Sequence, residues 1–192
     1  MYAFFDRLAR VFALLGGVVL SVLILMTCLS IVGRQLNGLL HADWVTGLAP
    51  GAAQALLDLG IGPINGDFEL VEAGMAFAIF AFLPLCQIAG AHATVDIFTA
   101  RLPLRLTLAL TALWEVVFAV VLIVIAWKLY DGMAGKMRYG ETTFILQYPV
   151  WWSYAASLAA AALAAVVGVW MALVRLRAVA TGHAPEAREA GA

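Results

Sequence analysis

Four long apolar stretches, separated by charged connections, dominate the pattern of this chain. Each runs for about 19 residues or more without Asp, Glu, Lys or Arg, apart from one glutamate in the third stretch. A helix rises about 1.5 Å per residue, so stretches of this length cross the roughly 30 Å apolar core of a bilayer. The pattern predicts membrane-spanning helices at about residues 11–33, 69–91, 106–127 and 148–174. The predicted fold class is an all-α integral membrane protein with one four-helix domain, residues 1–180.

The segments before and between these stretches predict smaller elements. Tyr2–Phe12 carries its apolar side chains on one face, which is typical of a short interfacial helix. The outer connection, residues 34–68, includes a segment that begins with proline and ends before glycine, and this predicts a surface helix at about 50–59. Val95–Leu102 is expected to lie flat at the opposite interface. Residues 181–192 are polar and predict a disordered cytoplasmic tail.

The distribution of basic and aromatic residues favours a topology with both termini in the cytoplasm. Four crossings place the termini on the same side, where six basic residues lie near the membrane against four on the other side. The six are Arg7, Arg10, Arg101, Arg105, Arg175 and Arg177, and the four are Arg34, Lys128, Lys136 and Arg138. One outer interfacial belt of aromatic residues is also predicted, comprising Trp127, Tyr130, Tyr148, Trp151, Trp152 and Tyr154.

Composition narrows the possible classes of function. Hydrophobic residues make up 65% and charged residues 12%, against about 25% charged residues in soluble proteins, so the chain is expected to reside in the bilayer. A net charge of -1 without a basic stripe argues against nucleic acid as a partner. No nucleophile elbow, phosphate-binding loop or zinc-binding motif is present, so no enzyme is indicated. The three histidines lie where no two could clamp a haem between facing helices, which disfavours a redox anchor.

Charged residues gather at both ends of the second predicted crossing. Arg34 ends the first crossing, and Asp67, Glu69 and Glu72 begin the second, so an antiparallel pair would bring all four to the outer interface. Glu69 and Glu72 share a helix face, and an arginine nearby would relieve their repulsion. The cluster predicts a structural ion pair, with a docking rim for another protein and an ion site as alternatives. At the inner end, His92 and Asp96 form a predicted interfacial turn.

Two polar residues and one stripe of small residues lie within the predicted crossings. Glu115 is deep in the third crossing and is expected to be neutral, or hydrogen-bonded to a hydroxyl such as Ser21 or Thr27 or to a partner subunit, with a proton relay as the alternative. Gln87, near Pro84, is expected to need polar contacts of the same kind. The stripe indicates close helix packing, either within the chain or against a larger membrane subunit. It consists of Ala156, Ala160, Ala164 and Gly168.

Three strings, GDFELVE at 66–72, FLPLCQ at 82–87 and HATVDIF at 92–98, together resemble one family. The resemblance is to the small-permease (DctQ-like, Q) subunit of tripartite ATP-independent periplasmic (TRAP) transporters. It implies a bacterial inner-membrane scaffold for uptake of an organic acid or similar solute by sodium symport. Its implied partners are the large permease (M) subunit and the periplasmic solute-binding protein (P). No cofactor is implied in this chain, since sodium is expected in the large subunit.

Two other functions are alternatives to the scaffold. An independent small proton-coupled exporter would use Glu115, and a membrane anchor would hold a redox complex. The outer connection at 34–68 is longer than the brief link expected in smaller members of the family, and this suggests an added outer contact surface.

Overall fold

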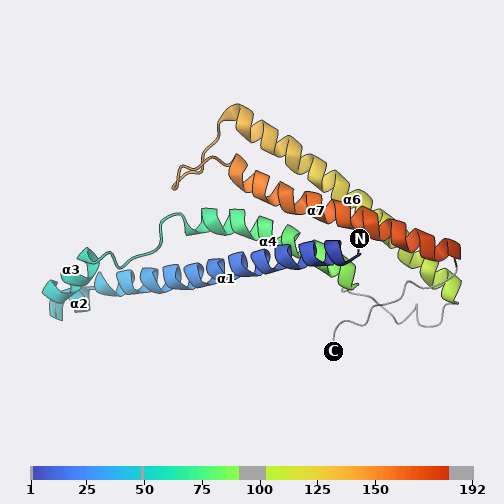
Figure 1. The fold of residues 1–192 in the computed structure, drawn as a ribbon. Helices are drawn as coiled ribbons and strands as arrows, with labels where there is room; N and C mark the ends of the chain where they lie inside the picture. The colour runs from blue at the N-terminus through green and yellow to red at the C-terminus, as the bar shows by residue number, and fades with distance from the viewer. Residues whose placement is uncertain (1, 49, 91–102, 182–192) are drawn as a thin grey trace.

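The computed structural model describes residues 2–48, 50–90 and 103–181, and this part of the chain folds into α-helices joined by short loops (Figure 1). The helices are α1 (Tyr2–Leu40), α2 (Asp43–Leu48), α3 (Pro50–Asp58), α4 (Asp67–Ala89), α6 (Leu104–Tyr139) and α7 (Trp151–Thr181). Among the described residues, β-structure is limited to one isolated bridge between Thr142 and Pro149. The predicted all-α fold is confirmed.

Four of these helices, α1, α4, α6 and α7, are long and apolar enough to cross a membrane. This confirms the four predicted spanning helices. The helices run further than the apolar stretches, because α1 continues for 39 residues, about 58 Å at 1.5 Å per residue, and α6 for 36 residues. A helix that leaves the bilayer keeps its backbone hydrogen bonds, so nothing forces it to end at the interface.

Tyr2–Phe12 is helical and leads into the first crossing as predicted, but it forms the first turns of α1 and not a short helix of its own. Ala9, Ala13 and Gly16 are buried on one face that continues directly into the crossing. No proline or glycine interrupts the helix between Phe12 and Gly16, so the helix has no reason to break. The predicted elements at Val95–Leu102 and in the tail after Thr181 lie outside the described residues.

The spanning helices pack as an open row in the order α1, α4, α7, α6 (Figure 1). Half of the most apolar window of α7 is buried, against 17% of the corresponding windows of α1 and α6. The central position of α7 follows from its small side chains, which let α4 and α6 approach from two sides. Helices α1 and α6 therefore flank the row and present most of their apolar surface outward.

The stripe of small residues in α7 is used within the chain. Ala160 and Ala164 are fully buried, and a Cβ added to Gly168 would lie 3.0 Å from Gln87 Nε2 and 3.4 Å from Leu122 Cδ1. Of the two alternatives for the stripe, the structure shows internal packing at these three positions. Ala156, the first position, is exposed.

Replacing Ala164 by leucine is expected to lower the midpoint of thermal unfolding by about 4 to 10 °C, since overpacking a tight contact costs about 1–3 kcal/mol. The matched control is Ala156→Leu, the same change two turns earlier on the exposed side, which should shift the midpoint by less than about 2 °C. Thermal unfolding of both purified variants in mild detergent measures this difference. Equal midpoints would show that α7 does not pack through Ala164.

Candidate functional site

One face of α1 holds the segment that leads into α4. Ser30, Gly33 and Asn37 follow each other at helical spacing, so they lie on the same side of α1. Asn37 Nδ2 donates a hydrogen bond to the Ile61 carbonyl oxygen at 3.0 Å, and the Ile64 amide donates to Ser30 Oγ at 3.2 Å. Between these bonds the helix has no side chain at Gly33, and the loop backbone occupies that space. We call this contact the α1–α4 junction.

Asp67, the first residue of α4, completes the α1–α4 junction. Its carboxylate accepts hydrogen bonds from Ser30 Oγ at 2.5 Å and from the Phe68 amide at 2.8 Å, and it lies 3.7 Å from the Arg34 guanidinium. A carboxylate at this position also complements the positive end of the helix dipole. Ser30 is completely buried, whereas the Arg34 side chain is 63% exposed. The serine hydroxyl is therefore the stronger of the two contacts, because water screens the exposed ion pair.

Removing the hydroxyl in Ser30→Ala is expected to lower the midpoint of thermal unfolding by about 3 to 6 °C, since both the Asp67 carboxylate and the Ile64 amide lose a partner. Removing the guanidinium in Arg34→Ala should lower it by less than about 2 °C. Parallel melting curves in detergent test this order. A larger effect of Arg34→Ala would show that the ion pair, and not the Ser30 hydroxyl, contributes most to the stability of the junction.

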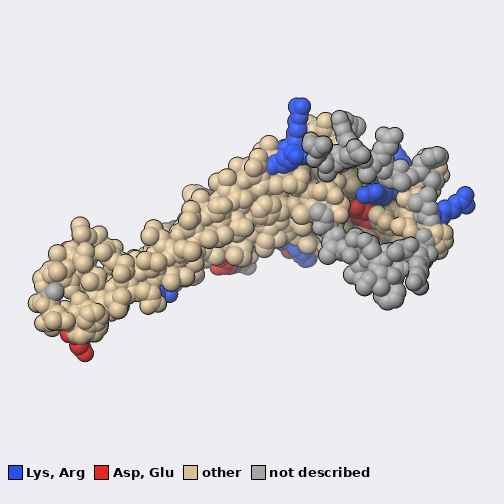
Figure 2. Space-filling view, turned by 90° about the horizontal axis from the view of Figure 1, so that it is seen from below, with Lys and Arg blue, Asp and Glu red and all other residues tan. Residues whose placement is uncertain are grey.

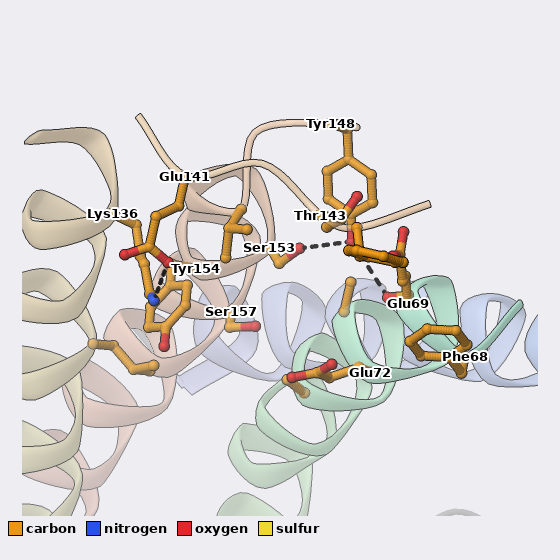
Figure 3. A pocket seen from close by; sticks show the side chains of 15 residues that line it. Phe68, Glu69, Glu72, Lys136, Glu141, Thr143, Tyr148, Ser153, Tyr154 and Ser157 are labelled. Carbon is orange, nitrogen blue, oxygen red and sulfur yellow. Dashed lines mark hydrogen bonds and ion pairs between the residues drawn. The ribbon is translucent and has the colours of Figure 1, made fainter. Parts of the chain in front are cut away.

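Glu69 ties α4 to the loop between α6 and α7. Its buried carboxylate accepts hydrogen bonds from the backbone amides of Ile145, at 2.7 Å, and Leu146, at 3.0 Å. The Tyr148 hydroxyl donates to the Glu69 carbonyl oxygen at 3.3 Å, and Figure 3 shows these two residues adjoining. Segments more than 70 residues apart in the chain are thus joined at one carboxylate. We call this contact the Glu69 junction.

The structure does not bring Glu69 or Glu72 to Arg34, so the predicted four-residue cluster is divided. Residues two apart on a helix point in nearly opposite directions, so Asp67 faces α1 while Glu69 faces the 140–150 loop. Glu72 is exposed, and no hydrogen bond or ion pair of its side chain is present among the described residues. The rotation of α4 about its axis gives Asp67 and Glu69 different neighbours.

The other polar residues predicted within or beside the spanning helices are Gln87, Glu115, His92 and Asp96. Gln87 is completely buried beside Gly168, and neither amide atom has a hydrogen-bond partner in the described part of the chain. Glu115 is partly buried on α6. The hydroxyls of Ser21 and Thr27 each donate to the carbonyl four residues earlier in α1, so neither donates to Glu115. His92 and Asp96 lie outside the described residues, and their interfacial turn stays a prediction.

The predicted aromatic belt stays a prediction, and its residues differ in exposure. Trp127, Tyr130 and Trp152 are exposed, whereas Tyr148, Trp151 and Tyr154 are partly buried. Helix α6 continues for 12 residues beyond Trp127, about 18 Å at 1.5 Å per residue, before the loop leads to Trp151 at the start of α7. The first turn of α7 lies beside α6 before α6 ends, because Tyr154 contacts Gly132, five residues after Trp127.

Several structurally important residues were missed by sequence reasoning. Ser30, Gly33 and Asn37 were not selected, although polar or small residues spaced three, four and seven apart at the end of an apolar helix indicate a polar packing face. Ile145 and Leu146 carry no comparable signal, because they contribute backbone amides rather than side chains.

Within the described residues, no group of three His, Cys, Asp or Glu side chains is placed to hold a metal ion.

Four long apolar helices, joined by polar contacts at one end, define a multi-pass membrane protein. The chain belongs to the DctQ family, because the model described as "Tripartite ATP-independent periplasmic transporters, DctQ component" matches residues 23–178. The match begins within α1 and ends within α7, and so includes both junctions. Comparisons with curated proteins and with solved structures gave no match. The protein is thus the small membrane subunit of a TRAP-type transporter.

Proposed function

We propose that this chain is the scaffold that holds the large permease (M) subunit in the membrane during sodium-driven uptake of an organic acid or similar carboxylate solute. The observation that supports this role best is the open row of helices. Only 17% of the apolar windows of α1 and α6 is buried, so both flanks offer long apolar faces to a neighbour. The small-residue stripe of α7 packs against other helices of the same chain. We therefore assign the contact with the large subunit to the flanking helices α1 and α6.

The two junctions suit a scaffold because they make the row stiff. The α1–α4 junction joins the first two spanning helices, and the Glu69 junction joins α4 to the loop between the other two. Each spanning helix among the described residues is continuous, whereas solute sites in secondary transporters are usually formed by interrupted helices. We therefore assign the solute and the coupling sodium ions to the large subunit.

The arm formed by the end of α1 with α2 and α3 is the proposed contact for the periplasmic solute-binding protein (P). Figures 1 and 2 show this tip standing apart from the row of spanning helices. Trp44, Leu48 and Leu59 are 64%, 80% and 79% exposed there, and apolar side chains exposed at the tip of an arm favour contact with a protein. This assignment places the arm in the periplasm and both termini in the cytoplasm.

Co-expression with the large subunit encoded beside this chain tests the scaffold role. An affinity tag on this chain is expected to retain the large subunit through purification in mild detergent. Uptake in proteoliposomes should require both membrane subunits, the binding protein and a sodium gradient. Failure to retain the large subunit, with both proteins well expressed, would reject the scaffold.

A proton-coupled exporter remains a distinct alternative, because Glu115 is an ionisable residue partly buried on a spanning helix. Liposomes containing this chain alone separate the two functions. The scaffold predicts no solute movement in these liposomes with or without Glu115→Gln. Transport by the chain alone that is abolished by Glu115→Gln would establish the exporter.

A further inference from the structure

A cavity of about 460 Å³ opens between α4, α6, α7 and the 140–150 loop (Figure 3). This volume lies within the range of small-molecule sites, about 300–1,000 Å³. Neither junction fills it, although Glu69 forms part of its wall. The cavity therefore has room for a ligand that the proposed scaffold role does not account for.

The walls of this cavity change from charged to apolar along the helices. Glu72, Lys136 and Glu141 supply charged side chains, whereas Ala73 and Ala76 are the next lining residues of α4 toward its apolar middle. Leu129 of α6 lies on the apolar part as well, two helical turns before Lys136. A wall of this kind fits an amphiphile, with its polar group at the charged residues and its chain along the alanines.

The charges of the cavity favour a cation. Three carboxylates and one ammonium group line it, and two of the carboxylates already have partners. Glu69 accepts the loop amides, and Glu141 is paired with Lys136. The third carboxylate, Glu72, has no partner among the described residues, so it can accept hydrogen bonds from a bound cation.

Ser157 provides an independent indication of a ligand. It lies on α7 and is only 2% exposed, and its hydroxyl has no hydrogen-bond partner within the described part of the chain. Figure 3 shows Ser157 and Glu72 on facing walls of the cavity. A buried hydroxyl without a partner is costly, and a donor placed in the cavity would satisfy it.

We propose that the cavity binds the primary ammonium group of an amphiphile at Glu72, with the apolar chain against Ala73, Ala76 and Leu129. A primary ammonium carries three N–H donors for the free acceptors of Glu72 and Ser157, whereas a quaternary ammonium carries none. The ammonium can come from a lipid with an ethanolamine headgroup or from a free amine. The site is separate from the scaffold role and does not depend on it.

Native mass spectrometry of the full purified chain tests the proposal with dioleoyl phosphatidylethanolamine and dioleoyl phosphatidylcholine as probes. The ethanolamine lipid is expected to bind about tenfold more tightly, which is the effect of one charge-assisted hydrogen bond. Glu72→Gln should abolish this preference. The control Asp131→Asn, an exposed carboxylate on α6 outside the cavity, should retain it. Ala76→Leu, which fills the apolar part without changing charge, should weaken binding of the ethanolamine lipid.

Competition by free ethanolamine distinguishes a lipid headgroup from a free amine as the source of the ammonium group. Competition at millimolar concentration would show that the ammonium alone suffices, and lack of competition would show that the lipid chains are required; both results support an ammonium site. Equal binding of the two lipids, or an unchanged preference in Glu72→Gln, would overturn the proposal. It also falls if Glu72→Gln leaves lipid binding unchanged but releases the large subunit, because the cavity would then hold a basic side chain of that subunit.

Discussion

Gly33→Ala is expected to lower the midpoint of thermal unfolding by about 6 to 12 °C, because a Cβ at this position has no room. A Cβ at Gly33 would lie 2.2 Å from the Gly62 carbonyl oxygen and 2.9 Å from its carbonyl carbon. Both are backbone atoms and cannot rotate away, so the loop must move off α1. Overpacking of this kind costs up to about 3 kcal/mol, and 1 kcal/mol corresponds to about 2–4 °C for a chain of this size.

The displaced loop would also lose two hydrogen bonds on either side of Gly33, those from Asn37 to Ile61 and from Ile64 to Ser30. Gly38→Ala is the matched control, because a Cβ at Gly38 meets nothing within 4 Å and alanine favours the helix. Its midpoint should be unchanged or raised by about 2 °C. If both alanine variants melt at the temperature of the unmodified protein, the loop does not pack against Gly33.

Glu69→Ala is expected to release the 140–150 loop from α4 and to lower the midpoint of thermal unfolding by about 5 to 10 °C. The variant leaves the amides of Ile145 and Leu146 without the carboxylate that accepts their hydrogen bonds. Hydrogen–deuterium exchange measures the release directly. Exchange of these two amides should rise at least tenfold, while amides in the middle of α7 keep their protection.

Glu72→Ala is the control for Glu69→Ala. Both residues are glutamates in the first two turns of α4, but Glu72 is exposed and holds no loop amide. Its loss should shift the midpoint by less than about 2 °C and leave exchange of Ile145 and Leu146 unchanged. Equal exchange in the two variants would mean that overall charge, not the Glu69 junction, holds the loop.

The two junctions lie at the same end of the helices and have a common consequence for assembly. They fix α1 and the loop between α6 and α7 to either side of α4, so they set the spacing of the four helices at this end. Variants that open a junction are therefore expected to weaken retention of the large subunit, although Ser30 and Glu69 themselves are buried. The proposed scaffold role and the stability of the chain thus depend on the same contacts.

Particular residues show how far sequence reasoning reaches in this protein. Arg34 and Asp67 were placed at one interface from helix direction alone, and the structure places them 3.7 Å apart. Glu69 was placed at the same interface but assigned the wrong neighbour. Antiparallel order determines the level of a residue along a helix, whereas its neighbour depends on how far the helix is rotated about its axis.

The α7 stripe illustrates the same limit. Spacing every fourth residue predicted close packing, yet it could not decide between an internal helix and a separate subunit. Only the positions of α4 and α6, brought by chain segments outside α7, show that Ala160, Ala164 and Gly168 pack internally.

The sequence by itself determined the four spanning helices, the inner-membrane location and the family of this protein. These properties depend on the length and apolarity of continuous segments and on short motifs, all of which can be read along the chain. The tertiary structure alone decided the open order α1, α4, α7, α6, the pairing of Glu69 with the loop amides and the cavity beside Glu72. These depend on helix rotation and on contacts between residues more than 70 positions apart, and no local pattern encodes them.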